Sequence, residues 1–182
     1  MEKITFRQAI AEDALFISEG FHMAMLISNP PKERIALFAE KICSRNDVLY
    51  SAQNTILAEK DGKPVGMITS YDGKNYSAFR KTTMALVKEH LGIEFPGMED
   101  EAAEGEYYLD SLAVLPECRG LKVGTRLLKE AISRGHALGL PVTLVVDPDN
   151  PKARKLYESL GFSFLRKIFI FGHHYDKMIL RA

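Results

Sequence analysis

Residues 112–131 of the chain read LAVLPECRGLKVGTRLLKEA, and this stretch joins a short apolar segment to an amphipathic helix through a basic loop with two glycines. Val123, Leu127 and Ala131 recur at helical spacing, which places the first helical turn near residues 120–125. The first N–H groups of a helix have no internal partner and together carry about half a positive charge. Such a loop can bind an anion, although an ordinary strand-to-helix turn with solvated lysines has the same composition.

A second stretch, DPDNPKARKLYESLGF at residues 147–162, has the start and stop signals of a short helix. Asn150 is a favourable N-cap, Pro151 suits the first helical position, and Gly161 is typical of the residue after a helix. Tyr157 lies on the apolar stripe of this helix. Its side chain is compatible with a half-buried core aromatic and also with a hydroxyl that takes part in chemistry.

The rest of the chain alternates between β-rich and helical patterns. The predicted strands are 3–10, the two arms of a hairpin over 54–73, 106–115, 141–147, 163–171 and 174–182. The predicted helices are 11–26, 32–45, 76–92, 123–139 and 150–162, and the sequence NPP at 29–31 is expected to end the first of them. Hairpins imply antiparallel pairs, and the strand–helix–strand passage implies a parallel pair. The expected fold is α/β, with a mixed, mainly antiparallel central sheet and helices on both faces.

The length of 182 residues favours a single domain over 1–182. Within it, residues 72–105 change character, from a helix to an acidic segment punctuated by glycine and proline. We expect this part to be a helical and acidic insertion near the active face or an interaction element. It has no core content of its own, so we do not expect a second domain.

The composition limits which binding partners and which cellular compartment we expect. Lys plus Arg and Asp plus Glu are both 24, so the formal net charge is zero. Proteins that bind nucleic acid or anionic membranes usually have a basic excess, and we expect neither partner here. The two cysteines, Cys43 and Cys118, form no CxxC pair, and no signal peptide or membrane-spanning run is evident. We expect a cytoplasmic protein.

The two stretches resemble the two signatures of the GNAT superfamily of acyl-CoA-dependent N-acetyltransferases. LAVLPECRGLKVGTRLL is similar to its acetyl-CoA-binding motif, Q/R-x-x-G-x-G/A, with Arg119 at the first position and Gly124 at the last. N-P-x-A-x-x-L-Y-x-x-L-G-F, from Asn150 to Phe162, is similar to the second signature. The two motifs span 112–162, and the first half of the chain agrees with the family in the order of its elements.

Lys122 departs from the first motif, because the family usually has glycine at that position. A positive φ at a lysine costs about 1 kcal/mol. We expect the loop to adapt, or φ to be negative at Lys122, with the amine available to phosphate.

The resemblance implies that acetyl-CoA is the co-substrate, without a metal, and that its acetyl group moves directly to a primary amine in a ternary complex. The implied acceptor is a small molecule or a peptide. The acidic run 99–106 suggests a cationic amine, polyamine or lysine-like, although a charge run is more often a solvated loop. In the family, the strand before the loop binds the pantetheine arm and the loop binds the pyrophosphate. The implied acetyl-CoA contacts are Leu112, Ala113, Val114, Arg119, Gly120, Leu121, Lys122, Val123, Gly124, Thr125 and Asn150.

The resemblance also implies a proton donor and a base. The tyrosine of the second motif, here Tyr157, protonates the departing thiolate. A phenol with a pKa of about 10 suits this step because a free thiol has a pKa of about 8.5. For the base, strand periodicity places Glu106, Tyr108, Asp110, Leu112 and Val114 on one side. Asp110 is the first candidate and Glu106 the second, and either could instead be a solvated or salt-bridged carboxylate.

Other readings remain open. A non-catalytic acyl-CoA-binding or regulatory module would keep the loop and lose the acid, so the presence of Tyr157 argues against it. An interaction protein could use residues 72–105 as its contact surface. Adjacent His173 and His174 face opposite ways on a strand, which disfavours a metal pair. The exposed final strands are compatible with a homodimer.

Overall fold

The computed structural model describes residues 4–25 and 32–181. Its strands are β1 (Ile4–Gln8), β2 (Thr55–Lys60), β3 (Lys63–Asp72), β4 (Tyr107–Val114), β5 (Val142–Val146), β6 (Ser163–Ile170) and β7 (His173–Leu180). Its helices are α1 (Ala14–Met25), α2 (Lys32–Cys43), α3 (Tyr76–Leu91), α4 (Val123–Ala137) and α5 (Pro151–Ser159). The predicted strands and helices are confirmed in type and order over the described ranges. The predicted helix stop at 29–31 lies outside them.

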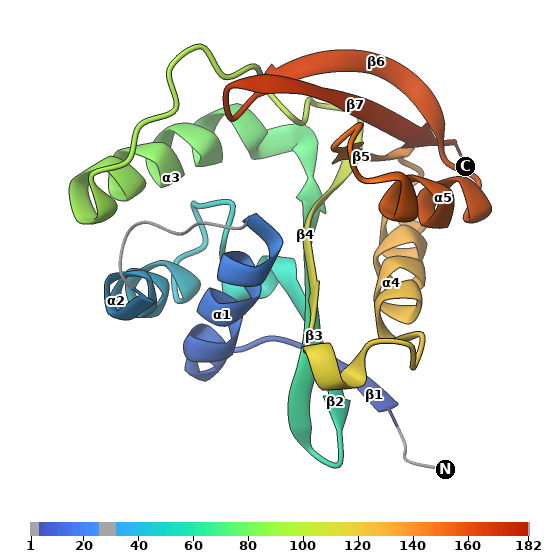
Figure 1. The fold of residues 1–182 in the computed structure, drawn as a ribbon. Coiled ribbons are helices and arrows are strands. Elements are labelled where there is room, and N and C mark those ends of the chain that lie inside the picture. The colour runs from blue at the N-terminus through green and yellow to red at the C-terminus, as the bar shows by residue number, and fades with distance from the viewer. Residues whose placement is uncertain (1–3, 26–31, 182) are drawn as a thin grey trace.

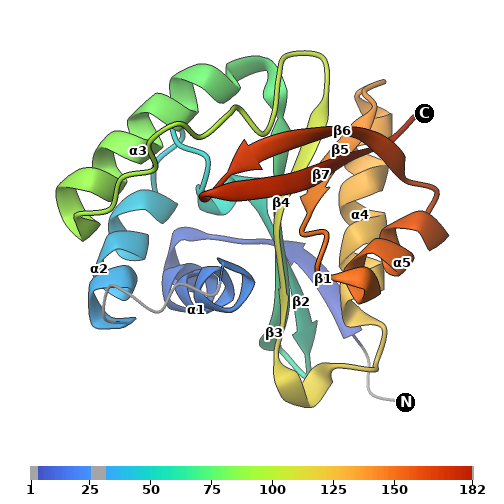
Figure 2. The ribbon, with the colours of Figure 1, turned by 45° about the horizontal axis from the view of Figure 1, so that its top comes forward.

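The strands form one mixed sheet in the order β1-β2-β3-β4-β5-β7-β6. The β4–β5 pair is parallel, and the other neighbouring pairs are antiparallel. In Figure 1, α1, α2 and α3 lie on one side of the sheet, and α4 and α5 lie on the other. Figure 2 shows the β6–β7 hairpin running across the direction of β4. The expected α/β fold with helices on both faces is therefore confirmed.

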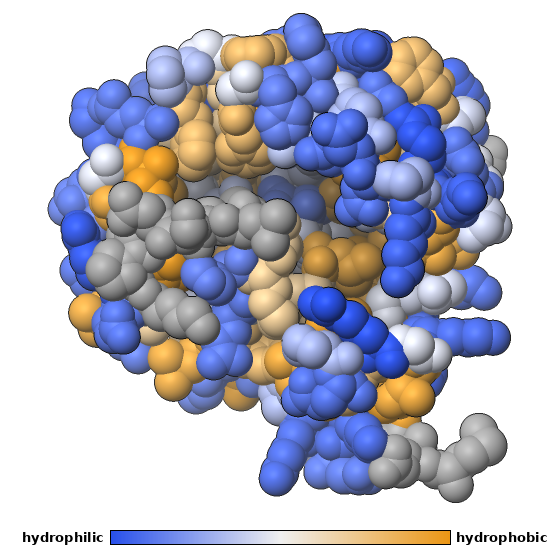
Figure 3. Space-filling view, in the orientation of Figure 1, coloured by the Kyte–Doolittle hydropathy of each residue, from blue (hydrophilic) through white to orange (hydrophobic). Residues whose placement is uncertain are grey.

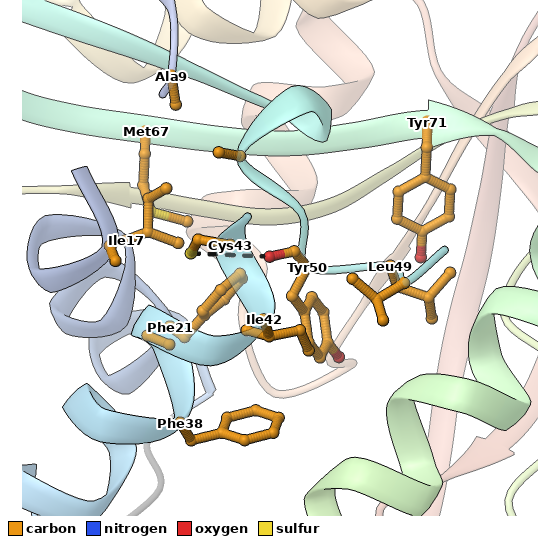
Figure 4. Packing of buried hydrophobic residues seen from close by; sticks show 14 of the residues in the cluster. Ala9, Ile17, Phe21, Phe38, Ile42, Cys43, Leu49, Tyr50, Met67 and Tyr71 are labelled. Atoms are coloured by element: carbon orange, nitrogen blue, oxygen red, sulfur yellow. Dashed lines mark hydrogen bonds between the residues drawn. The ribbon is translucent and has the colours of Figure 1, made fainter. Parts of the chain in front are cut away.

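Each face of the sheet has its own apolar core. On the side of the N-terminal helices, Phe21 packs against Tyr50 with ring centroids 4.7 Å apart, beside Ile42 and Phe38 (Figure 4). The core on the other side packs α4 against the sheet through side chains such as Leu127, which is fully buried. Site residues contributed by β4 can therefore face either of two separate environments. Over the described ranges, none of the helices has the length and apolarity that a membrane crossing requires.

A β-bulge changes the face that β4 presents. Its register with β3 shifts between Thr69, which pairs with Ser111, and Ser70, which pairs with Leu109, so Asp110 is the extra residue. A bulge reverses the alternation of side chains beyond it. Tyr108 is accordingly buried in the N-terminal core, whereas Leu112 and Val114 pack on the α4 side. The expectation that these residues share one side of the strand is wrong, because period two does not continue through a bulge.

Strands β4 and β5 separate beyond the same bulge. Only residues 107–109 of β4 pair with β5, opposite residues 142–144. From Asp110 to Val114, the β4 edge facing β5 has no strand partner among the described residues. This leaves backbone N–H and C=O groups available at the centre of the molecule.

Residues 72–105 are built into the N-terminal core. Tyr76 and Val87 of α3 and Ala102 of the following loop are buried in it. At Gly73, an added Cβ would lie 1.8 Å from the Ala103 carbonyl oxygen, so glycine permits a close approach of the two ends of this segment. The segment contributes residues to the core that it shares with the N-terminal helices. The single domain over 1–182 stays a prediction.

Candidate active site

A cleft of about 790 Å³ lies where β4 and β5 separate. On the side of α5 it is lined by Leu112, Val146, Asn150, Leu156 and Tyr157. On the side of the N-terminal helices it is lined by Tyr50, Phe95, Glu101, Asp110, Phe171 and Tyr175. The surface is hollowed near the centre of the face seen in Figure 3. The fold thus brings residues from both predicted motifs, and from the acidic run, to a single opening.

Tyr157 presents an unpaired hydroxyl to this cleft. Its side chain is half-buried on α5, with its ring edge-on to Phe162 at a centroid distance of 6.1 Å. Among the described residues, no group forms a hydrogen bond with the Tyr157 hydroxyl. Burial raises the pKa of Tyr157 above its usual value, so the hydroxyl keeps its proton at neutral pH. The arrangement suits a proton donor to a group inside the cleft.

The loop before α4 leaves a run of backbone donors free. Within the described chain, no carbonyl or side chain accepts from the N–H groups of residues 120–125, and the helix has no side-chain cap. The first bond of this turn is donated by the Arg126 N–H to the Lys122 carbonyl, 3.1 Å away. Successive free N–H groups at a helix N-terminus form an anion-binding concavity.

Lys122 has the backbone conformation that its sequence motif usually gives to glycine. Its φ is 60° and its ψ is 18°, in the left-handed region, at the N-cap of α4. The expectation of a negative φ at Lys122 is wrong. Because a side chain at this φ is strained, the lysine bears a cost of about 1 kcal/mol. Its side chain is exposed.

The three cationic side chains of the loop take different directions. Arg119 Nε lies 3.4 Å from the Val114 carbonyl oxygen, which keeps the guanidinium beside the end of β4. Arg126 instead donates to the Ile4 carbonyl at 3.1 Å and stacks on the Phe6 ring at 4.7 Å. Arg126 therefore contacts β1, and its guanidinium group packs on that strand.

Asn150 and Gly124 each make a short-range contact beside the loop. Asn150 Oδ1 accepts from the Ala153 N–H at 3.1 Å, so this side chain caps α5 while its residue lines the cleft. An added Cβ at Gly124 would lie 3.5 Å from Val114 Cγ2, an ordinary contact distance. Gly124 is therefore tolerant of a methyl group, and a larger side chain would extend from this point of the loop.

Asp110 is held in the cleft by two hydroxyl groups. The Tyr71 hydroxyl donates to its Oδ2 at 2.6 Å, and Ser111 Oγ donates to its Oδ1 at 2.6 Å. Burial raises the pKa of Asp110 above its usual value, and the two hydroxyl donors partly oppose that rise. A carboxyl group whose pKa is raised is a stronger base, once ionised, than an ordinary surface carboxylate.

Glu101 is a cleft residue that the sequence did not single out. It lies in the loop after α3, is 9% exposed, and its Oε2 accepts from the Tyr108 hydroxyl at 2.8 Å. Burial, and secondly the charge of Asp110, raise the pKa of Glu101 to about 8. The acidic run 99–106 was the signal available from the sequence. It could not identify which of its carboxylates points inward.

Glu106 has different surroundings from Asp110. Its Oε1 accepts from Lys177 Nζ at 2.5 Å and from the Ala103 N–H at 2.7 Å. Lys177 is 4% exposed at its side chain, so this is a buried ion pair. Glu106 does not line the cleft, and the structure brings Asp110 together with Glu101 instead.

Cys118, His173 and His174 have contacts that indicate structural roles. Cys118 is buried in the core under α4. His173 Nε2 lies 3.2 Å from Asp147 Oδ2, and the His174 ring contacts Phe169. Over residues 4–25 and 32–181, no group of three or more His, Cys, Asp or Glu side chains could hold a metal ion.

Comparison with known proteins gives a consistent result. A model of the acetyltransferase (GNAT) family matches residues 21–162. The fold is similar to the crystal structure of an N-acetyltransferase from Staphylococcus aureus Mu50, with a TM-score of 0.79 and 26% identity over 97% of this chain and 100% of that one. None of the curated proteins compared with the chain matches it.

Two further structures share the fold. The histone acetyltransferase HPA2 and related acetyltransferase from Corynebacterium glutamicum ATCC 13032 has a TM-score of 0.70 and 18% identity, over 100% of this chain and 97% of that one. The aminoglycoside N-acetyltransferase AAC(6')-Iy in complex with CoA has a TM-score of 0.63 and 15% identity, over 95% and 96%. At these identities the likeness concerns the fold alone.

Proposed function

The chain belongs to the GNAT acetyltransferase family, and from this premise we propose that it moves the acetyl group of acetyl-CoA to a primary amine of a small molecule or peptide by direct transfer. One observation carries the proposal. The Tyr157 hydroxyl, unpaired among the described residues, lines the same cleft as the carboxyl groups of Asp110 and Glu101. A proton donor and a proton acceptor thus border one space large enough for two substrates. The N-acetyltransferase from Staphylococcus aureus, at 26% identity, supports an amine acceptor.

The free backbone groups fit acetyl-CoA. The N–H groups of residues 120–125 would bind its pyrophosphate, with Arg119 and Lys122 nearby. The unpaired edge of β4 at residues 112–114 would form hydrogen bonds with the amides of the pantetheine arm. Asn150 and Tyr157 would border the thioester end. When bound, acetyl-CoA supplies an activated acetyl group as a thioester.

The side chains of the cleft would manage two protons. Asp110 and Glu101 together take the proton that the acceptor's ammonium must lose before its nitrogen can bond to the acetyl carbon. Tyr157 holds its proton at the hydroxyl and gives it to the sulfur as the carbon–sulfur bond breaks, and its phenolate takes up the second proton that the nitrogen loses as the amide forms. Burial raises the pKa of all three groups, which keeps the Tyr157 donor protonated and makes the ionised carboxyl pair a stronger proton acceptor.

The test is release of the CoA thiol from acetyl-CoA in the presence of a panel of primary amines, with the acetylated amine identified by mass spectrometry. We expect thiol release that depends on the amine. Tyr157→Phe should lower kcat by about 10²-fold, within the range for a lost general acid, without changing the Kd for acetyl-CoA. The hydroxyl makes no hydrogen bond with the described residues, so stability should not change.

Tyr175→Phe is the matched control, because it removes a hydroxyl from the same cleft on the side away from α5. It should keep kcat within about threefold, since no step is assigned to this hydroxyl. A protein that binds acetyl-CoA and acetylates none of the amines would instead be a non-catalytic acyl-CoA-binding module. Equal kcat values for Tyr157→Phe and the wild type would remove Tyr157 as the proton donor.

A further inference from the structure

We propose that the acetyl acceptor is a small primary monoamine with a short apolar substituent. Its ammonium group binds at Glu101 and Asp110, and its substituent enters an apolar pocket next to them. This inference names the acceptor of the proposed reaction and therefore rests on the proposed function. Two neighbouring features carry it: a carboxyl pair without a cationic partner, and a pocket lined almost entirely by hydrocarbon.

The carboxyl pair lacks an ion-pair partner within the described ranges. The nearby cations form ion pairs with other residues, Arg80 with Asp100 and Lys177 with Glu106, and their charges lower the pKa of Glu101 without an ion pair to it. Glu101 is 9% exposed, and its Oε1 accepts no hydrogen bond from any described residue. A carboxyl oxygen that lines a cleft without a partner, on a side chain that is largely buried, is suited to a cationic donor from outside.

The surfaces around the pair suit one ammonium group. Tyr50, Phe95 and Phe171 line the cleft on this side, and aromatic faces attract a cation. The other acidic residues of the cleft, Asp147 and Asp149, lie beside Asn150 on the α5 side, where acetyl-CoA is proposed to bind. Asp147 also lies within 3.2 Å of His173. Glu101 and Asp110 are thus the carboxyl groups that would bind the ammonium group of the acceptor.

An apolar pocket opens next to the pair. It lies between α1, α2, α3 and the loop after α3, and it shares Tyr50, Phe95 and Phe171 with the cleft. Phe21, Phe38 and Tyr50 gather around Ile42 at one wall (Figure 4). The opposite wall consists of Met84, Val87, Leu91 and Ile93.

The size and polarity of the pocket limit what it accepts. Its free volume is about 50 Å³, whereas a water molecule needs about 10–15 Å³, so the space fits a short alkyl group. His22 and the Tyr50 hydroxyl are its polar groups. Placing an ammonium group there would remove the charge from water without an anionic partner, which is strongly unfavourable. The acceptor should therefore carry one charge and an apolar end.

The experiment compares n-pentylamine with 1,4-diaminobutane, which have the same chain length and differ only in whether the far end of the chain is a methyl group or an ammonium group. We expect kcat/KM to be at least about 10²-fold higher for n-pentylamine, because the second charge of the diamine must enter the apolar pocket. A diamine used as well as the monoamine, or better, would overturn the inference.

A variant pair then locates the discriminating pocket. Met84→Glu places a carboxylate in its wall, and we expect the preference for n-pentylamine to fall by at least about tenfold, since the second ammonium gains a partner. Ala85→Glu adds the same charge at the neighbouring, exposed position of α3, outside this pocket, and should leave the preference unchanged. Equal preferences in both variants would show that the pocket does not select the acceptor.

The outcomes separate this inference from the proposed function. If other amines of the panel are acetylated and n-pentylamine is not, the apolar acceptor is wrong while the acetyltransferase stands. If no amine at all is acetylated, the proposed function fails and this inference fails with it.

Discussion

Asp110 is the residue at which β4 changes the face that its side chains use. It is the extra residue opposite Thr69 and Ser70 of β3, and the reversal brings it to the same cleft as Glu101. Strand periodicity predicts the orientation of side chains only where the register is regular. The sequence therefore indicated Asp110 as a candidate base, but it could not predict which residues surround Asp110 in the fold.

The acidic limb of the pH–rate profile should report the carboxyl pair. Activity falls as the pH drops through the pKa of the pair, because the base becomes protonated. The charge of Asp110 contributes to the raised pKa of Glu101, so Asp110→Asn should move the acidic limb of kcat/KM to lower pH. The Asp110→Asn, Glu101→Gln double variant should lose this limb and at least about 10²-fold in kcat/KM.

The control for this profile is Glu106→Gln. Glu106 is paired with Lys177 outside the cleft, so its loss should not displace the limb, even if stability decreases. All variants are measured with the same amine, so that the titration of the acceptor is common to them. A double variant that retains the wild-type limb would exclude both carboxyl groups as the base and favour another group or a water chain.

At the scale of elements, the loop before α4 keeps the backbone conformation of its sequence motif, although Lys122 stands where the motif usually has glycine. Lys122 adopts a φ of 60° that glycine adopts without strain. Lys122→Gly should therefore raise the free energy of unfolding by about 1 kcal/mol and Tm by about 2–4 °C. It should weaken acetyl-CoA binding by less than about tenfold, because an exposed lysine contributes little beside the backbone donors.

Gly124, two residues after Lys122, allows a substitution that should abolish acetyl-CoA binding at the same loop. Gly124→Asp places a carboxylate among the free N–H groups at the start of α4, where it would compete with phosphate, so acetyl-CoA binding should be lost. Gly124→Ala is the matched control, because an added Cβ would make only ordinary contacts with Val114 and Leu112. Calorimetric titration with acetyl-CoA measures both variants, and equal Kd values would contradict the assignment of the phosphate site.

At the scale of the whole molecule, the elements were predictable from local patterns, and the cleft was not. Helical and strand periodicities are properties of neighbouring residues, and they identified the secondary structure on both sides of the sheet. The separation of β4 from β5 depends on pairing between distant segments, and so does the inward position of Glu101. The burial of Tyr76 and Val87 likewise depends on α1 and α2, which the sequence of residues 72–105 does not contain.

The two sides of the cleft should respond to different ligands, which amide hydrogen exchange can measure on the intact protein. Acetyl-CoA should slow exchange at residues 120–125 by at least about tenfold, because N–H groups without a partner would become donors to charged phosphate oxygens. Exchange at the edge of β4, residues 112–114, should also slow. An amine added to the CoA complex should then slow exchange at residues 95–103, which carry Glu101.

Strand β2 is the internal control, because it is paired on both edges, with β1 and with β3, and lies away from the cleft. Its exchange should be slow in all states and insensitive to either ligand. Unchanged exchange at residues 120–125 with acetyl-CoA would reject the loop as the pyrophosphate site, whatever the activity. Protection by the amine at residues 120–125 instead of 95–103 would show that the acceptor does not bind on the side of Glu101, because each ligand should order only the groups that it contacts.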